Sequence, residues 1–176
     1  FLSKNVYWLF ANLTEMTVEE YNQSVDKYSD GIYRFILKNL RDTEYSRDIV
    51  QDAYERLWKN LANVSGEKVK SYLFTTAYHV MIDHIRKNKR VDHVDEFSGR
   101  HIKDYTQYSD LQEILHQAVD KLLQVQKSVV LLRDYEGYSY EEIGEITGLN
   151  ESQVKVYIYR AKVFLRNYIG SLETVI

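Results

Sequence analysis

Apolar residues recur at intervals of three and four along much of the chain, the spacing of one buried face of an α-helix. The clearest run covers residues 18–40, and Thr17 with Glu20 forms a capping-box pattern at its start. A second run covers residues 49–61 and a third covers roughly 70–89. The first half of the chain is therefore predicted to contain three amphipathic helices.

This periodicity stops at residues 91–109, which are polar and acidic with little aliphatic content. A second capping-box pattern, Ser109 to Gln112, follows, and helical spacing then resumes. We therefore predict an all-α protein of two small helical domains. The expected divisions are an N-terminal extension (1–16), a first helical bundle (17–90), a flexible linker (91–109) and a four-helix second domain (110–176).

The second domain is expected to end in a helix-turn-helix spanning Ser139–Lys162. Five apolar residues there have the spacing needed to pack two crossed helices: Ile143, Ile146, Leu149, Val154 and Ile158. Gly148 can adopt the positive φ that such a turn needs, and Gly144 suits a close approach of the helices. The second helix would bury one face and expose the other to a DNA major groove. DNA reading is the leading hypothesis from the residues alone.

Composition narrows the class of protein. The 176 residues include no proline and no cysteine, which favours helix and excludes disulfides and thiolate metal sites. No apolar run reaches the roughly 18 residues of a membrane span, and the beginning of the chain lacks a convincing signal-peptide pattern. We expect no direct membrane insertion and a cytoplasmic location.

The formal net charge of −3 is unevenly distributed. Residues 67–90 hold six Lys or Arg and two Asp or Glu, and residues 151–176 hold four and two. Positive charge is thus concentrated at the end of each predicted domain, as suits two DNA-facing surfaces on an otherwise acidic protein.

Four motifs in order give a more specific indication. The first is Asp48-Ile-Val-Gln-Asp-Ala-Tyr-Glu-Arg-Leu-Trp58, and the second is Ser71-Tyr-Leu-Phe-Thr-Thr-Ala-Tyr-His-Val-Met-Ile-Asp-His-Ile-Arg86. The third is Glu136-Gly-Tyr-Ser-Tyr-Glu-Glu-Ile143, and the fourth joins Val154-Lys155 to Arg160-Ala-Lys162. With a linker between the second and third, the chain over about residues 18–170 resembles the extracytoplasmic-function (ECF) sigma factors, small bacterial initiation factors of the sigma-70 family. Tyr72 and His79 depart from the usual Trp and Asn of that family.

The resemblance implies a factor that binds core RNA polymerase and directs promoter-specific initiation. Its first domain would melt the minus-ten element, and its second would read the minus-thirty-five element. Such factors are usually held inactive by an anti-sigma partner, often at the membrane. The implied partners are therefore core RNA polymerase, promoter DNA and an anti-sigma factor, with no cofactor and no small-molecule substrate.

An acidic and amide stripe on one helix is implied to bind the polymerase. Its members are spaced i, i+3, i+4 and i+7: Asp48, Gln51, Asp52 and Glu55. From the residues alone, a solvated helix face is the favoured interpretation, and the resemblance turns the preference to polymerase binding. Trp58 is expected mainly in the core, with the polymerase interface as the alternative.

Two sets of residues are candidates for DNA contact. The minus-ten set combines cations for phosphates with rings for unpaired bases: Lys70, Tyr72, His79, Arg86, Lys87, Lys89 and Arg90. The minus-thirty-five set lies on the predicted recognition helix: Ser152, Gln153, Lys155, Val156, Tyr157 and Arg160. Phe74 is assigned to the core.

Two other functions are alternatives. A stand-alone helix-turn-helix regulator would explain residues 139–162 but not the acidic stripe or the basic aromatic helix. A decoy that copies the fold to titrate a partner would be expected to lack the basic residues. Catalysis by the chain itself is not expected, because no phosphate loop or nucleophile elbow is apparent, and His79 with Asp83 makes only a weak metal pair.

Overall fold

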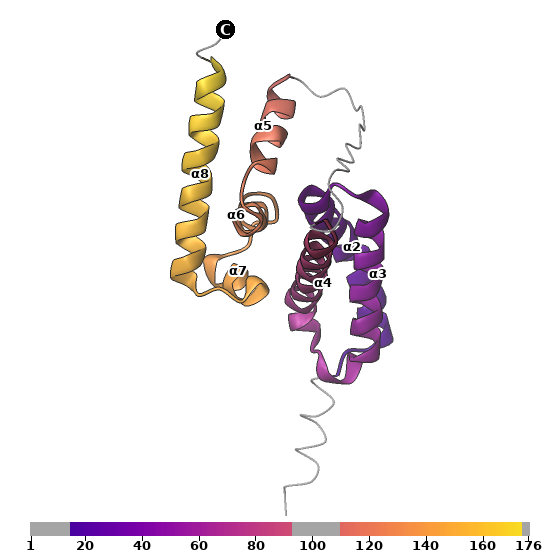
Figure 1. The fold of residues 1–176 in the computed structure, drawn as a ribbon. Coiled ribbons are helices and arrows are strands. Elements are labelled where there is room, and N and C mark those ends of the chain that lie inside the picture. The colour runs from indigo at the N-terminus through magenta and orange to yellow at the C-terminus, as the bar shows by residue number, and fades with distance from the viewer. Residues whose placement is uncertain (1–14, 93–109, 174–176) are drawn as a thin grey trace, which may run out of the picture. The chain divides into compact units, whose positions relative to one another are not determined.

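The computed structural model describes residues 15–92 and 110–173. The chain forms two compact units that divide between Val94 and Asp95 (Figure 1). Every regular element in the described residues is helical. The prediction of an all-α protein of two helical domains is therefore confirmed.

The first unit is built from three long helices. They are α2 (Val18–Leu40), α3 (Thr43–Lys59) and α4 (Val69–Asp92). The predicted capping box is present: the Thr17 side chain accepts from the Glu20 amide, and the Glu20 carboxylate accepts from the Thr17 amide at 2.8 Å. The start of α3 is capped by Asp42, which accepts from the Tyr45 amide at 2.9 Å.

The core of the first unit runs along the seam where these helices pack against one another. Its largest fully buried side chains are Ile32, Phe35, Ile36, Ile49, Leu57, Leu73, Phe74 and Met81. The rings of Phe35 and Phe74 lie 6.0 Å apart, so the assignment of Phe74 to the core is confirmed. The Tyr54 hydroxyl donates to the Ser24 carbonyl at 2.7 Å and joins α3 to α2. Burial raises the pKa of Tyr54 well above its usual value.

The loop expected between the second and third helices contains two short 3₁₀ turns. They are η1 (Leu61–Asn63) and η2 (Gly66–Lys68). The Met16 amide donates to the Leu61 carbonyl at 3.1 Å, which fixes the chain just before α2 against this connection.

Trp58 is a correction to the sequence analysis. The side chain was expected mainly in the core, but it is 49% exposed, whereas Leu57 beside it is fully buried. Consecutive residues on a helix point about 100° apart, so only one of these two large apolar side chains can face the seam. Leu57 occupies it.

The second unit contains four α-helices and a single π-helical turn within its described residues. The helices are α5 (Asp110–Asp120), α6 (Gln124–Val130), α7 (Tyr140–Thr147) and α8 (Glu151–Glu173). The π turn, η3 (Leu131–Tyr135), extends α6. Ser109, the expected cap of α5, lies outside the described residues, as does most of the expected linker; α4 continues to Asp92.

In this unit α8 packs against α5, α6 and α7 (Figure 1). The fully buried side chains include Val129, Leu132, Ile143, Ile146 and Val154. An ion pair between a buried lysine and an exposed aspartate joins α6 to the end of α5: the Lys127 ammonium, in a residue only 5% exposed, donates to the Asp120 carboxylate at 2.7 Å.

None of the helices in the described residues combines the length and hydrophobicity that crossing a membrane requires.

Candidate nucleic-acid and polymerase interfaces

The acidic stripe lies on the outer face of α3. Its opposite face is fixed by the buried residues Ile49, Ala53 and Leu57, so the orientation of the stripe follows from the core. Asp48, Gln51 and Glu55 are exposed and Asp52 is half-exposed. The structure thus brings the four predicted polymerase-binding residues together on one surface.

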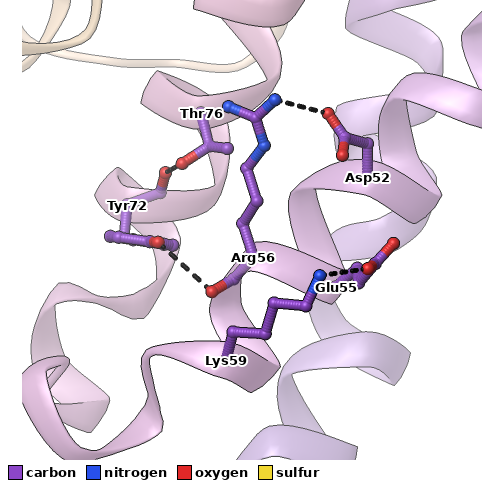
Figure 2. A network of polar contacts seen from close by, with 6 residues as sticks. All are labelled: Asp52, Glu55, Arg56, Lys59, Tyr72 and Thr76. Atoms are coloured by element: carbon purple, nitrogen blue, oxygen red, sulfur yellow. Dashed lines mark hydrogen bonds and ion pairs between the residues drawn. The ribbon is translucent and has the colours of Figure 1, made fainter.

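Cations on the same helix accompany this stripe. Arg56 donates to the Asp52 carboxylate at 2.9 Å, and Lys59 pairs with Glu55 (Figure 2). The hydrogen bond from Lys59 is the main reason that the pKa of Glu55 is lowered from its usual value. Both pairs are solvent-exposed, and such pairs contribute little to the stability of a helix. A partner of greater charge can therefore displace these cations at small cost.

Trp58 extends the stripe toward the end of α3. It follows Gln51 by seven residues and Glu55 by three, which places it on the same face. Its indole packs edge-on against the Tyr21 ring of α2 at 5.1 Å. A half-exposed tryptophan beside charged groups is the type of residue that often dominates the energy of an interface. Sequence reasoning weighed this role for Trp58 but favoured burial; the adjacent Leu57 was the indication that could have reversed the choice.

A line of candidate nucleic-acid contacts runs along α4. Tyr72, His79 and Arg86 are spaced by seven residues and so lie on one face. His79 is exposed, with its ring edge-on to Tyr78 at 5.6 Å. Lys70 precedes Tyr72 by two residues and so points about 200° around the helix from it, away from this line.

Tyr72 is partly held by the protein. Its ring is half-buried, and its hydroxyl points to the Arg56 carbonyl of α3 at the long distance of 3.5 Å (Figure 2). Thr76 donates to the Tyr72 carbonyl at 2.8 Å one turn further on. Tyr72 is therefore partly exposed, with its hydroxyl near α3.

The basic end of α4 carries the remaining predicted phosphate contacts. Arg86 and Lys87 are exposed, and Arg86 lies 3.7 Å from the Asp83 carboxylate. The side chains of Lys89 and Arg90 lie outside the described set, although their backbone continues the helix.

His84 lies beside these cations. Its ring stacks on Tyr45 at 3.5 Å, and its Nε2 lies 2.9 Å from the Asn88 amide nitrogen. Burial lowers the pKa of His84, Asp42 acts in the opposite sense, and Lys87 lowers it further. Sequence reasoning gave this histidine no role.

The helix-turn-helix has the predicted construction. Gly148 adopts φ 74° at the end of α7, as expected, and Ser139 with Glu142 forms a capping box at its start that was not among the sequence predictions. A Cβ atom on Gly144 would stand 2.7 Å from the Leu149 carbonyl oxygen, so this position requires glycine for the close approach that was expected.

The entrance to α8 is also capped, and Gln153 takes part. The Asn150 side chain accepts from the Gln153 amide at 2.8 Å, and the Gln153 side chain accepts from the Asn150 amide at 2.9 Å. A bidentate contact from Gln153 to adenine would therefore have to displace its oxygen from the cap.

The outer face of α8 presents most of the predicted reading residues. Ser152, Val156 and Arg160 are exposed at four-residue spacing. Tyr159 is 70% exposed and lies on this same face; sequence reasoning missed it, although its spacing from Ser152 is the helical i, i+7. Tyr157 is half-buried and turned toward the side of the helix.

Lys155 lies at the junction of α7 and α8. Its ammonium lies 2.6 Å from the Glu151 carboxylate and 5.5 Å from the centre of the Tyr140 ring. Further along α8, Lys162 donates to Asp134 of η3 at 3.1 Å.

Metal-ligating side chains do not gather in groups of three or more within the described residues. His79 and Asp83, the pair weighed above, lie on α4, where Asp83 is close to Arg86.

Family models match both units of the chain. Sigma-70 region 2 matches residues 25–91, and sigma-70 region 4 matches residues 112–165. The first match covers the three-helix unit with the acidic stripe, and the second covers the unit with the helix-turn-helix.

Individual relatives agree with these matches. RNA polymerase sigma factor SigV of Bacillus subtilis is 29% identical over 147 residues, covering 81% of this chain and 86% of the relative. ECF RNA polymerase sigma factor SigM of the same organism is 26% identical, covering 86% of this chain and 94% of the relative.

Solved structures show the same fold. Sigma factor RpoE, crystallised with the anti-sigma factor NepR from Bartonella quintana, aligns with a TM-score of 0.75 at 23% identity, covering 87% of this chain and 98% of that one. CnrH in complex with the cytosolic domain of CnrY aligns with a TM-score of 0.64 at 19% identity, covering 86% and 88%.

Proposed function

We infer the function of this chain from its family: it belongs to the sigma-70 family and is an ECF-type sigma factor, a bacterial transcription initiation factor. It binds core RNA polymerase and directs promoter-specific initiation. Sigma factors are not catalysts themselves; the polymerase makes the RNA. The observation that carries this conclusion is the presence, in one chain, of both a region 2 unit and a region 4 unit.

We propose that the outer face of α3 binds the polymerase. The argument rests on Asp48, Gln51, Asp52 and Glu55 sharing one surface with the half-exposed Trp58. Carboxylates and an amide on such a surface fit basic and polar partners and fix the register of docking. The indole adds apolar area that is removed from water on binding.

Promoter melting is assigned to α4 and the connection before it. Tyr72 and His79 offer rings to unpaired bases, each stacked base contributing about 1–3 kcal/mol. Arg86, Lys87 and the following basic residues would neutralise phosphates. Extruding a base costs a few kcal/mol, so one or two captured bases offset most of that cost without ATP.

The minus-thirty-five element is assigned to α8. Ser152, Val156 and Arg160 are exposed on its outer face. We add Tyr159 to this set because of its exposure. Arg160 suits the O6 and N7 acceptors of guanine, and Val156 suits the methyl group of thymine.

An anti-sigma factor is the proposed regulatory partner. In the two matched structures, RpoE is bound to the anti-sigma factor NepR, and CnrH is bound to the cytosolic domain of CnrY. A partner that covers α3 or α8 would block polymerase or promoter contact. We place the factor in the cytoplasm, where such a partner can hold it at the membrane.

The test is in vitro transcription with purified core RNA polymerase on genomic fragments, with start sites mapped. Addition of the full chain should yield transcripts from defined positions that core polymerase alone does not give. If no defined start is gained, the proposed function is wrong.

The rival function, a stand-alone helix-turn-helix regulator, makes the opposite prediction. It would bind a duplex site tightly without polymerase. Gel-shift measurements of the mapped promoter with the chain alone and with the holoenzyme separate the two, and the sigma-factor function requires tight binding only with polymerase present.

A further inference from the structure

The Tyr140 ring is the meeting point of three elements in the second unit. Tyr140 is the first residue of α7. The Arg133 guanidinium, from the π turn η3, lies over this ring at 4.6 Å, and the Lys155 ammonium, from α8, lies over it at 5.5 Å. Both distances are within the roughly 6 Å at which a cation is attracted to an aromatic face.

Each contact has a second anchor. Arg133 also donates to the Tyr138 carbonyl at 2.7 Å, which holds its guanidinium against the chain that leads into α7. Lys155 also pairs with Glu151 at 2.6 Å, one turn earlier on α8. The Arg133 side chain is therefore already held by a backbone carbonyl. Lys155 is otherwise paired only within α8, and the Tyr140 ring gives it a contact with a second helix.

The Glu151 pair alone does not fix Lys155. Both side chains of that pair are more than half exposed, and exposed i, i+4 pairs are weak and screened by salt. A lysine stem keeps several rotamers, and their loss opposes any contact that requires one position. The Tyr140 ring limits that freedom before DNA arrives.

The ammonium still has donors for a ligand in this position. A lysine ammonium carries three N–H donors, and the Glu151 contact uses one of them. The attraction between the ring face and the ammonium charge is electrostatic and does not require a particular N–H donor. A phosphate oxygen can therefore bind Lys155 without breaking either contact.

We propose that Tyr140 is a positioning residue for promoter binding: its ring holds the Lys155 ammonium at the α7–α8 junction, where it meets a phosphate of the DNA backbone. The proposal rests on the proposed function, since it takes the outer surface of the second unit to be the DNA-binding surface. Tyr140 acts through Lys155, and its hydroxyl is dispensable.

The contact itself is tested in the free full-length protein by NMR. The ring current of Tyr140 should shift the Lys155 side-chain methylene resonances upfield. Tyr140→Phe should keep this shift, and Tyr140→Leu should abolish it. Equal Lys155 shifts in the wild type and Tyr140→Leu would overturn the proposal, whatever the protein binds.

The consequence is tested in the holoenzyme, on the promoter fragment with the strongest mapped start site. Tyr140→Leu should weaken binding about two- to fivefold, the factor expected for one exposed cation–aromatic contact. Tyr140→Phe should bind as the wild type does. Lys155→Ala should weaken binding and reduce the slope of log affinity against log salt by about one.

The double variant Tyr140→Leu/Lys155→Ala is decisive. It should bind as Lys155→Ala alone does, because the ring then has no ammonium to hold. The same loss from Tyr140→Leu in both backgrounds would overturn the proposal, and so would a Tyr140→Phe variant as weak as Tyr140→Leu, which would indicate a direct hydroxyl contact. Tyr140→Gln replaces the Leu variant if the latter loses the native amide spectrum.

Different results would contradict the sigma-factor function and the positioning role of Tyr140. A wild-type holoenzyme that binds no fragment contradicts the proposed function. A wild-type holoenzyme that binds, with no coupling between Tyr140 and Lys155, contradicts only the positioning role.

Discussion

The two units hold their candidate interfaces in place by different means. In the first unit, the interfaces are outer faces of long helices, α3 of 17 residues and α4 of 24, and many buried side chains set their orientation. In the second unit, the reading face also lies on a long helix, α8 of 23 residues with Val154, Ile158 and Ala161 buried, but the start of that helix is set by one short turn. This turn has Gly148 at φ 74° and the reciprocal cap between Asn150 and Gln153.

Because of this difference, we expect a change of charge and a change of side-chain volume to act differently in the two units. A distributed core leaves the first unit able to accept a charge change on α3 without loss of fold, so such a change should affect binding alone. In the second unit, the angle between α7 and α8 depends on a few backbone positions in a short turn. A small steric change there should therefore lower the stability of the unit first, and weaken DNA reading as a result.

The largest effect is expected from charge reversal on the first unit. Asp52→Lys should cost about 2–5 kcal/mol of polymerase affinity, because the new cation would repel the basic groups of the polymerase that the Asp52 carboxylate is proposed to contact. Co-purification with core polymerase measures it, with circular dichroism as the check on folding. The matched control is Asp30→Lys, which breaks the similar Asp30–Arg34 pair on α2. Equal retention of both variants by the polymerase would contradict the assignment of the α3 face.

A steric change in the second unit comes next. Gly144→Ala should lower the free energy of unfolding of that unit by about 1–3 kcal/mol, because its Cβ would meet the Leu149 carbonyl oxygen at 2.7 Å. Gly170→Ala on α8 is the control: apart from the adjacent backbone of α8 itself, no atom lies within 4 Å of its Cβ position, and alanine there should stabilise the helix by up to about 1 kcal/mol.

The two units can be followed separately in this experiment. The second unit contains no tryptophan, and Trp58 lies on α3, so the fluorescence of Trp58 reports on the first unit. A Trp8→Phe background leaves Trp58 as the single tryptophan. Hydrogen exchange of the α7 and α8 amides reports on the second. Faster exchange in α7 and α8 with an unchanged fluorescence transition is expected; a shift of the fluorescence transition instead would show that the units do not respond independently.

Base reading by α8 gives an effect of similar or smaller size. Arg160→Ala should cost about 1–3 kcal/mol at the upstream promoter element and relax sequence preference at one base pair. Arg166→Ala, an exposed arginine further along α8, should change neither. Holoenzyme binding to a set of single-base promoter variants measures both, and unaltered preference in Arg160→Ala would remove Arg160 from the reading set.

The smallest effect concerns pH and the first unit. The pKa of His84 is lowered by burial. At a pH near or just below the usual histidine pKa, the unfolded chain therefore binds a proton at His84 more readily than the folded chain does. The free energy of unfolding should therefore fall as pH falls from above 6.5 toward the folded-state pKa. Urea denaturation at about pH 7.5 and about pH 5.5 measures this.

Two variants identify the source of that pH dependence. His84→Gln should remove the part that comes from the imidazole. Tyr45→Ala should reduce it, because loss of the stacked ring at 3.5 Å exposes His84 to water. An identical pH dependence in His84→Gln and the wild type would contradict the prediction.

Much of the fold could be predicted because the relevant forces are local. The Thr17–Glu20 and Ser139–Glu142 caps, the apolar stripe of α2 and the left-handed Gly148 each depend on residues within about one turn of each other. The order of four motifs likewise identified the family that region 2 and region 4 matches then showed.

Side-chain environments were harder to predict, because they depend on neighbours that are distant in the chain. Trp58 and Leu57 are adjacent apolar residues, and only the packing of α3 on α2 and α4 decides that Leu57 is buried and Trp58 exposed. The polarity of α8 suggested Gln153 for base reading, whereas in the structure its oxygen caps the helix.

The sequence by itself determined the helices, the capped start of α2, the turn at Gly148, the division into two units and the family, since these follow from periodicity, capping and motif order. Only the tertiary structure decided which side chains share a surface: Tyr72 with the Arg56 carbonyl, and Tyr140 with Arg133 and Lys155. The physical reason is that a contact between helices depends on their packing and relative rotation. These are set by the whole core and are not encoded in any one segment.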